Sequence, residues 1–462
     1  MQPDSAPTDH GLKRELGLWD LVFTQILFIV GLGWVGAAAK LGSSHVTFWL
    51  IAVVLFYIPS AVVVIHLSRR MPFEGGLYEW ARLAVNERAG FLVGWNLWLY
   101  AMALMSEVGV QATTSLSYAL GAPWIAESKW SMALASLLIL GGLTALSTIG
   151  LGAGKWLHSA GGVTMVVIFA AMIGLTAVGW ARGAKPVSAP FEWKMPRMTL
   201  FNLNILGKMG FAALGGFEYV AIFAGESRNP AKIIARSVMI SAPVIALMFI
   251  LGTGAVLFWV PVSEVDLVSP VSQVLAIGAK PFGVAAQLAG AVIMAVVGMR
   301  IAQASITFSA TARLPMVAGW DHLLPKWFTE LHPTFKTPVN SILFVGAATL
   351  TCSLVGMTGV ARQEAFQLFN NVSGIFYALT YLAMFALPFV LKGVPAGVRI
   401  ASASGFLMTL LYVALSIFPI VEVGSSATFT AKICLVILAG NIAGIAIFEL
   451  SRNRAAPVRE RV

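Results

Sequence analysis

Long runs of apolar residues alternate with short polar segments along almost the whole of this chain. A run of about 20 apolar residues is long enough to cross the ~30 Å hydrocarbon core of a bilayer as a helix. The pattern predicts twelve transmembrane helices, at residues 18–41, 46–67, 91–118, 130–149, 157–180, 200–224, 235–260, 284–311, 339–357, 365–391, 401–420 and 431–450. We therefore expect an all-α polytopic membrane protein.

Two of the predicted spans, the first and the sixth, are interrupted by glycines near their middle, at Gly31–Gly36 and at Gly215-Gly216. Each glycine weakens a helix by roughly 1 kcal/mol relative to alanine and lets the backbone leave helical geometry. Open backbone groups are tolerated in a membrane where they line a cavity or are buried in protein. Interruptions five spans apart are typical of inverted-repeat transporters with a site at the midplane. The alternative for Gly215-Gly216 is close approach of a neighbouring helix.

The composition agrees with a membrane protein, because 58% of the 462 residues are hydrophobic and 11% are charged, whereas soluble domains have about 25% charged residues. The net charge of +10 does not indicate nucleic-acid binding, because the basic residues cluster between spans. Most of them fall on the side of both termini, so we predict cytoplasmic termini and a multi-pass protein of the cell (inner or plasma) membrane. The loop after the fifth span, which holds Arg182 and Lys185, is an exception.

The interrupted spans divide the chain into predicted parts. These are a cytoplasmic N-terminal tail (1–17), a transporter core (18–391), two additional C-terminal helices (392–450) and a basic tail (451–462). Within the core, two inverted five-helix repeats would cover about 18–180 and 200–391, because successive spans cross the membrane in alternating directions.

Four charged residues lie inside predicted spans: Glu107, Lys208, Glu218 and Arg300. A charge at the membrane centre costs roughly 2.5–3.5 kcal/mol on insertion scales, so such residues face the protein interior and find partners. At 1.5 Å per residue, Glu107 lies ~24 Å from Phe91 and Arg300 lies ~20 Å from Arg313, both measured from the predicted cytoplasmic ends of their helices. We therefore predict a Glu107–Arg300 salt bridge, with Lys208 as the second candidate partner of Glu107. Glu218 is expected to accept hydrogen bonds from unwound backbone. The alternative is that each charge snorkels or binds backbone separately.

The sequence contains no pattern typical of an enzyme. We expect no catalytic residues, no cofactor and no metal site, because the two cysteines and six histidines show no metal-ligand spacing. Gly31–Gly36 matches the dinucleotide fingerprint G-x-G-x-x-G, but it lies in a membrane helix and no acid follows about 20 residues later. A membrane-embedded enzyme would require a nucleophile–base or metal constellation in the spans, and the spans contain none.

Several short motifs occur in a characteristic order: P-x-x-G-G-x-Y at Pro72–Tyr78, Gly216-Phe217-Glu218, E-x-x-N-P at Glu226–Pro230, and Asp321–Pro325. Together they resemble the amino acid–polyamine–organocation (APC) superfamily of secondary transporters over essentially the whole chain. In the last motif, His322 replaces the glycine of the family's D-G-L-L-P. The resemblance implies a LeuT-like five-plus-five inverted repeat with broken helices 1 and 6. It also implies secondary active transport or exchange of amino acids by alternating access.

The resemblance further implies that backbone N–H groups of span one hold the substrate α-carboxylate, and that carbonyls of both broken spans lie near its α-amino group. Physically, the start of a half-helix attracts anions and its end attracts cations. Carried over to this chain, the substrate-binding positions are Gly31, Leu32, Gly33, Trp34, Leu214, Gly215, Gly216 and Phe217. Phe217 resembles the family's aromatic gate. Other transporter-like roles remain alternatives: a carrier of polyamines or other organic amines, a non-transporting sensor, or a channel.

Two departures from the family concern substrate and ion coupling. The usual Gly-Ser-Gly of span one is Gly31-Leu32-Gly33 here, so a hydroxyl is missing and Trp34 follows directly. Proton-coupled members often carry a lysine in span five, and none occurs here between Trp156 and Gly179. The hydroxyls of Ser305 and Thr307 could form a sodium site, or could simply bond to carbonyls of their own helix. Coupling to H+ or Na+ and exchange without an ion therefore remain open.

Overall fold

The computed structural model describes residues 17–459 apart from 72–75, 151–154, 192–193, 195–196, 220–229 and 321–322. The described residues form helices and connecting segments, without a strand among them. The helices of the first half are α1 (Leu18–Ile29), α2 (Trp34–Ala39), α3 (His45–Ala52), α4 (Ile58–Arg70), α5 (Leu77–Ala84), α6 (Glu87–Met105), α7 (Val108–Leu120), α8 (Trp124–Glu127), α9 (Lys129–Thr148) and α10 (Lys155–Ala181). Those of the second half are α11 (Leu200–Gly207), α13 (Pro230–Trp259), α14 (Pro270–Ala279), α15 (Val284–Val317), α16 (Lys326–Thr329), α17 (Val339–Gly356), α18 (Arg362–Val390), α19 (Ala396–Leu415) and α20 (Ser426–Arg459).

Ten helices or continuous helical stretches of the described chain are long and apolar enough to cross a membrane. They correspond to ten of the twelve predicted spans, and the two missing from the set are the first and the sixth. The first is divided into α1 and α2, and the sixth contains α11, the π-helical turn η3 (Lys208–Ala213) and a non-helical stretch after Leu214. The all-α polytopic fold with two broken helices is therefore confirmed.

The third span contains an interruption that was not predicted. Ser106 and Glu107 form a turn where α6 ends and α7 begins. The hydroxyl of Ser106 donates to the carbonyl of Met102, four residues back, and is also 3.2 Å from the carbonyl of Thr349. A serine that bonds back to the preceding turn is a known cause of helix bending.

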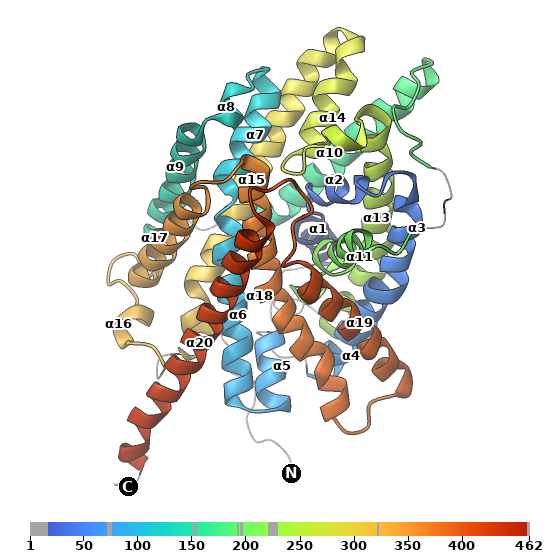
Figure 1. Cartoon of the computed structure of the whole chain (residues 1–462). Coiled ribbons are helices and arrows are strands. Elements are labelled where there is room, and N and C mark those ends of the chain that lie inside the picture. Colours follow the sequence, from blue (N-terminus) through green and yellow to red (C-terminus); the bar gives the residue numbers. More distant parts are fainter. Residues whose placement is uncertain are drawn as a thin grey trace.

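The helices form a bundle in which α8 and α14 lie at the upper end and α5 and the end of α20 lie at the lower end (Figure 1). Near the centre, α18 packs on α6, and α1 packs on both α10 and α13. The glycine pair Gly161-Gly162 of α10 explains the close contact with α1, because a Cβ atom on Gly162 would lie 2.3 Å from the carbonyl oxygen of Phe23. Small residues at such interfaces let membrane helices approach closely.

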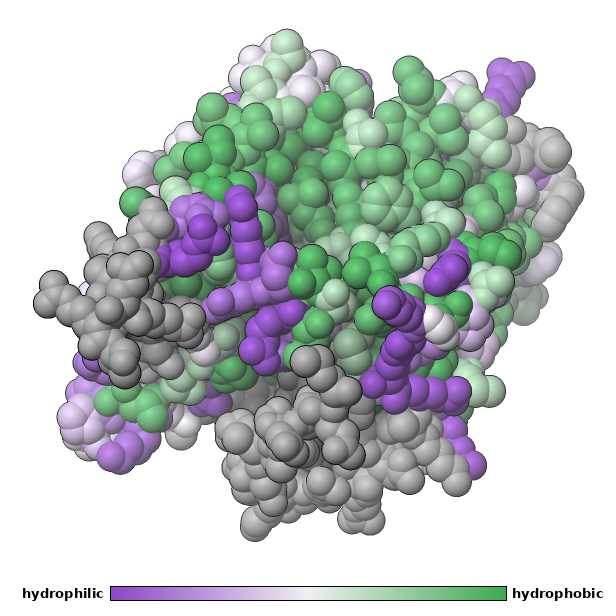
Figure 2. Space-filling view, turned by 90° about the horizontal axis from the view of Figure 1, so that it is seen from below, coloured by the Kyte–Doolittle hydropathy of each residue, from purple (hydrophilic) through white to green (hydrophobic). Residues whose placement is uncertain are grey.

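The outer helices expose apolar side chains, as expected for a surface in contact with lipid. Trp130 of α9 and Leu435 of α20 are 86% and 70% exposed. Seen from below, hydrophilic side chains gather in the middle of the lower face, and a broad hydrophobic area lies beside them (Figure 2). This distribution is typical of a membrane protein whose polar end emerges from the bilayer.

Parts of three sequence motifs lie outside the described residues: 72–75, 226–229 and 321–322. Of the motif Glu226–Pro230, the structure describes Pro230, which is the first residue of α13. Proline suits this position, because its missing N–H would have no partner in the first turn and its φ is already helical.

Candidate functional site

A cavity of about 150 Å³ lies between the two broken helices. It is lined by residues of the α1–α2 break, of η3 and the following Gly215, of the turn between α6 and α7, and of α15 and α18. Both glycine interruptions predicted from the sequence therefore reach one site. The predicted residues that line the cavity are Gly31, Gly33, Trp34, Glu107, Lys208, Gly215, Arg300 and Thr307.

At the first break, close contacts explain why glycines are required. The indole of Trp34 folds back over Gly31, so that a Cβ atom there would lie 2.5 Å from its Cδ1 atom. A Cβ atom on Gly33 would lie 3.1 Å from the carbonyl oxygen of Leu267 and 3.4 Å from the ring of Phe366. These contacts bring backbone to the cavity wall without intervening side chains.

At the second break, Gly216 has φ +129°, a conformation that favours glycine over residues with a side chain. Its N–H donates to the hydroxyl of Tyr381 at 2.7 Å. A Cβ atom on Gly216 would lie 2.8 Å from Cγ1 of Ile29, the last residue of α1. The two breaks therefore pack directly against each other, while the neighbouring Gly215 lines the cavity.

Four predicted binding residues are buried but do not line the cavity: Leu32, Leu214, Gly216 and Phe217. In particular, Phe217 does not lie at the cavity as the expected gate would, but stacks on Tyr57 with ring centroids 4.6 Å apart. The unusual φ of Gly216 explains this, because it turns the chain before Phe217 into the core.

Glu218 is buried and accepts hydrogen bonds from the hydroxyls of Tyr377 and Tyr381. Its side chain interacts with the backbone N–H of Glu218 itself, as expected from the sequence, and is also connected to the second break through Tyr381, which accepts the N–H of Gly216. Glu218 thus fixes the tyrosine that holds the second break. Its own carboxylate is not among the groups that line the cavity.

The predicted Glu107–Arg300 salt bridge is wrong, although both residues line the cavity. Glu107 accepts hydrogen bonds from the side-chain amides of Gln111 and, at 2.7 Å, Asn370. Arg300 donates to Oε1 of Gln303 at 3.4 Å, and no ion pair within the described chain joins it to Glu107. Glu107 lies at the turn between α6 and α7, and a depth estimated from the helical rise does not define the direction in which its side chain points.

Lys208, the second candidate partner, is also not paired with Glu107. Its ammonium group donates to Oδ1 of Asn371 at 2.7 Å and to the hydroxyl of Ser416 at 3.2 Å. It also lies 5.6 Å from the centroid of the Tyr412 ring, a distance at which a cation–π attraction acts. All of these partners are neutral.

The candidate ion-site hydroxyls do not converge. Ser305 and Thr307 are two positions apart on α15, which rotates one relative to the other by about 200° on a helix of 3.6 residues per turn. Thr307 lines the cavity, and its hydroxyl donates to the carbonyl of Gln303 within its own helix at 3.0 Å. Over the residues described, no group of three His, Cys, Asp or Glu could hold a metal ion.

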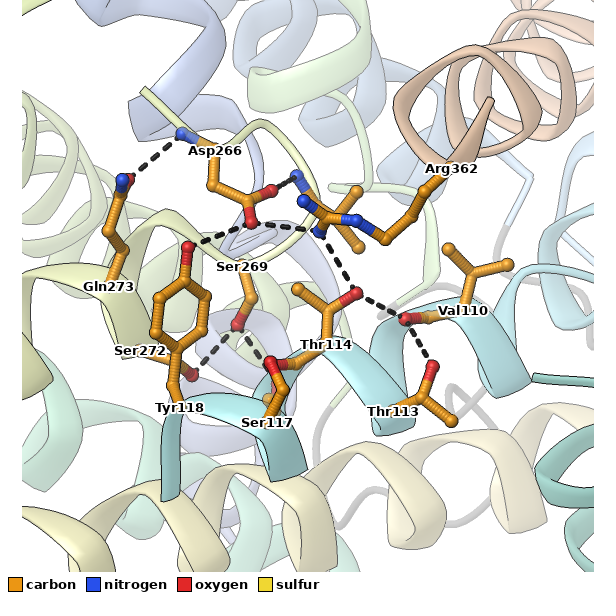
Figure 3. A network of polar contacts seen from close by, with 12 residues as sticks. Val110, Thr113, Thr114, Ser117, Tyr118, Asp266, Ser269, Ser272, Gln273 and Arg362 are labelled. Atoms are coloured by element: carbon orange, nitrogen blue, oxygen red, sulfur yellow. Dashed lines mark hydrogen bonds and ion pairs between the residues drawn. The ribbon is translucent and has the colours of Figure 1, made fainter. Parts of the chain in front are cut away.

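A polar network next to the cavity connects α7, the segment before α14, and α18 (Figure 3). The carboxylate of Asp266 accepts from Arg362, the first residue of α18, at 2.8 Å and from Tyr118 of α7 at 2.9 Å. Arg362 also donates to the hydroxyl of Thr114 at 3.2 Å. Leu267, which follows Asp266, contributes to the cavity wall. The network therefore fixes the segment that covers the first break.

The neutral polar residues of the cavity were not predicted from the sequence; they are chiefly Gln303, Asn370, Asn371 and Tyr377. A signal was present, because Asn370-Asn371 is an amide pair in the middle of an apolar span. Strongly polar residues within spans commonly face the bundle interior and mark functional paths. The motif Asn371-Val372-Ser373 resembles a glycosylation acceptor, and its position inside a span excludes that role.

Comparisons with known proteins give a consistent picture. The family model described as amino acid permease matches residues 16–440. The lysine-specific permease LysP of Escherichia coli is 26% identical over 396 residues, which cover 81% of this chain and 77% of LysP. The branched-chain amino acid permease BcaP of Bacillus subtilis is 24% identical over 377 residues, 77% of each chain. The crystal structure of MhsT in complex with L-phenylalanine shares the fold, with a TM-score of 0.58 and 13% identity over 87% of this chain and 98% of that one.

Proposed function

This chain belongs to the amino acid permease family, and from that premise we propose that it carries amino acids across the cell membrane through the cavity between its broken helices. It is a membrane transporter and not an enzyme. The observation that carries the proposal is the meeting of Gly31, Gly33 and Gly215 at one cavity. Open backbone at this depth is stable because it lines a cavity rather than facing lipid.

In the proposed complex, backbone N–H groups between Gly31 and Trp34 hold the α-carboxylate, and carbonyls at the two breaks hold the α-ammonium group. The start of α2 carries a partial positive charge that favours an anion. The end of α1 carries the opposite partial charge, and it lies against Gly216. Both ends of a zwitterion therefore have complementary backbone within a single site.

We further propose that the two halves of the core, 18–180 and 200–391, rock about this site to give alternating access. The proposed orientation places both termini in the cytoplasm. It is supported by the exposed Arg69 and Arg70 at the end of α4 and by Arg82 of α5, which belong to the lower end in Figure 1. Positive residues of short loops are enriched on the cytoplasmic side.

The test is counterflow in proteoliposomes preloaded with single amino acids or with putrescine, in the presence and absence of sodium and proton gradients. Saturable exchange of a labelled amino acid is the expected result and would distinguish a carrier from a channel or a sensor. Exchange of putrescine alone would contradict the proposal and favour an amine carrier. Absence of exchange with every substrate would also contradict it.

Gly33→Leu provides the matched variant. Gly33 has φ −72°, which any residue can adopt, so a leucine there acts through the space that it fills, next to the carbonyl of Leu267 at 3.1 Å and the ring of Phe366 at 3.4 Å. We expect it to abolish exchange while the protein still reaches the membrane. Gly298→Leu is the control, because a Cβ atom added to Gly298 on α15 would have no neighbouring atom within 4 Å. Equal exchange by both variants would place the substrate elsewhere.

A further inference from the structure

The charges that line the cavity do not balance. The carboxylate, amine and guanidinium groups in the described lining are those of Glu107, Lys208 and Arg300, which gives two formal positive charges and one formal negative charge. An amino acid bound as a zwitterion adds no net charge. The formal charges in the lining therefore sum to one positive charge, and Glu218, which accepts from the lining residue Tyr377, is the next carboxylate behind the wall. Charge interactions inside the helix bundle are stronger than in bulk solvent.

The one carboxylate is already occupied by neutral donors. Gln111 donates to Oε1 of Glu107, and Asn370 donates to Oε2 at 2.7 Å. Both oxygens of Glu107 thus accept hydrogen bonds from amides of α7 and α18. Within the described chain, Glu107 forms no salt bridge with Arg300. Glu107 contributes its charge to the cavity without neutralising either cation by direct contact.

Arg300 is the cation whose hydrogen-bonding capacity is least used. Its guanidinium group has five N–H donors, and its hydrogen bond to Gln303 is long at 3.4 Å. No salt bridge between described residues involves Arg300. Gln303 in turn donates to the carbonyl of Leu27 in the last turn of α1 at 3.0 Å. Arg300 is therefore held beside the first break, with the forked N–H donors of its guanidinium group available to a ligand.

Lys208 supplies the second positive charge, and its partners Asn371, Ser416 and the ring of Tyr412 orient the ammonium group without neutralising it. A buried cation without a counter-ion is unfavourable, and a bound anion relieves that cost. Because Lys208 is held on three sides by protein groups, we expect it to add to the electrostatic potential of the cavity and not to contact the substrate directly.

We infer that the preferred substrates are amino acids with an anionic side chain, and that Arg300 is the counter-ion of that side chain. This inference rests on the proposed function, because the backbone of the two breaks must hold the α-carboxylate and α-ammonium groups. A second carboxylate then meets the guanidinium fork, for which a bidentate pair is the favoured geometry. Amino acids with a cationic side chain meet two like charges in the same cavity and are disfavoured.

The experiment compares exchange of labelled L-glutamate, L-glutamine, L-leucine and L-lysine by the full-length protein in proteoliposomes. Glutamate and glutamine have nearly the same shape, so their ratio isolates the side-chain charge. We expect glutamate to be preferred, and Arg300→Gln to reduce glutamate exchange by about 30-fold or more, the usual effect of removing one partner of a buried charge pair. Glutamine exchange should be retained, so that the preference is lost or reversed.

Two further variants keep the test independent of folding. Arg313→Gln removes an exposed arginine of the same helix α15 and should leave the glutamate preference unchanged. Arg300→Lys keeps the charge without the fork and should retain part of the preference. A melting-temperature increase on adding glutamate to the detergent-solubilised wild type, absent in Arg300→Gln, gives a readout independent of transport.

The outcomes separate the two proposals. Exchange of leucine without preference for glutamate over glutamine overturns the anionic-substrate inference and leaves amino acid transport standing. Absence of exchange with all amino acids overturns both. Equal losses of glutamate and glutamine exchange in Arg300→Gln, together with a lower melting temperature, would show that Arg300 serves the carbonyl end of α1 and would also overturn the inference.

Discussion

Two groups of charged residues lie in the same helix bundle and differ in how their charges are balanced. In the network next to the cavity, Asp266 is 3% exposed and each of its carboxylate oxygens has a partner. One oxygen accepts from Arg362 and Tyr118, and the other accepts the N–H of Val268 at 2.9 Å. In the cavity, by contrast, Arg300 has no acid in contact among the described residues.

This difference separates a structural role from a binding role. A buried ion pair with all its hydrogen bonds formed connects the elements that carry it, and removal of one partner leaves an uncompensated charge. A cation that lines a cavity without a counter-ion stabilises little in the empty protein and is available for a ligand. The following experiments test the distinction, from the largest expected effect to the smallest.

Arg362→Gln should have the largest effect on stability. It leaves the buried carboxylate of Asp266 without its counter-ion, which typically costs about 3–5 kcal/mol. The measurement is thermal or chemical unfolding in detergent. Asp266→Asn combined with Arg362→Gln should recover part of the loss, and strictly additive losses would show that the pair does not act as a unit.

A surface pair provides the control for that experiment. Arg82 and Glu79 form a salt bridge of 2.9 Å on α5, where the arginine side chain is 53% exposed. Arg82→Gln should cost less than about 1 kcal/mol, because exposed pairs are screened by water and salt. A loss as large as that of Arg362→Gln would remove the basis of the comparison.

Tyr381→Phe should have an intermediate effect, because it removes both the acceptor of the Gly216 N–H and a donor to Glu218. Leaving buried polar groups without partners costs about 1–3 kcal/mol. Tyr57→Phe is the matched control, because the buried Tyr57 hydroxyl has no hydrogen-bond partner in the described part of the structure. Unfolding measurements that find the two variants equally stable would contradict the role assigned to Tyr381.

Arg300→Gln tests whether the cavity cation contributes to the stability of the empty protein. Since it removes one long hydrogen bond and no contacting counter-ion, we expect the free energy of unfolding of the empty protein to change by less than about 1 kcal/mol. Thermal unfolding without added substrate is the measurement. A destabilisation comparable to that of Arg362→Gln would mean that the cavity charge is structurally compensated after all.

The smallest effects are expected at Ser305 and Thr307. The Thr307 hydroxyl bonds within α15, and the two side chains leave the helix in different directions. Ser305→Ala and Thr307→Val should therefore leave both transport and its response to a sodium gradient nearly unchanged. Sodium-driven uptake that is lost in Ser305→Ala would contradict this expectation and restore the proposed ion site.

The sequence alone predicted much of the fold and the backbone part of the site. Ten predicted spans correspond to membrane-length helical stretches, and the remaining two contain the breaks at Gly31–Gly33 and Gly215-Gly216. The sequence did not correctly predict the contacts of side chains near those breaks and near the turn at Glu107. Phe217 stacks on Tyr57 in the core, because Gly216 turns the chain before it, and the carboxylate of Glu107 accepts from Gln111 and Asn370.

The physical reason lies in what a sequence fixes along a helix. The thickness of the bilayer sets the length of an apolar run, and the constant rise of 1.5 Å per residue sets the depth of each charge. Depth therefore brought Glu107 and Arg300 correctly to one cavity. The direction of a side chain around the helix axis is lost at every bend or break, because the turn there depends on packing against other helices. Tertiary structure alone thus decided that Asp266 pairs with Arg362 and that Arg300 faces the cavity without an acid in contact among the described residues.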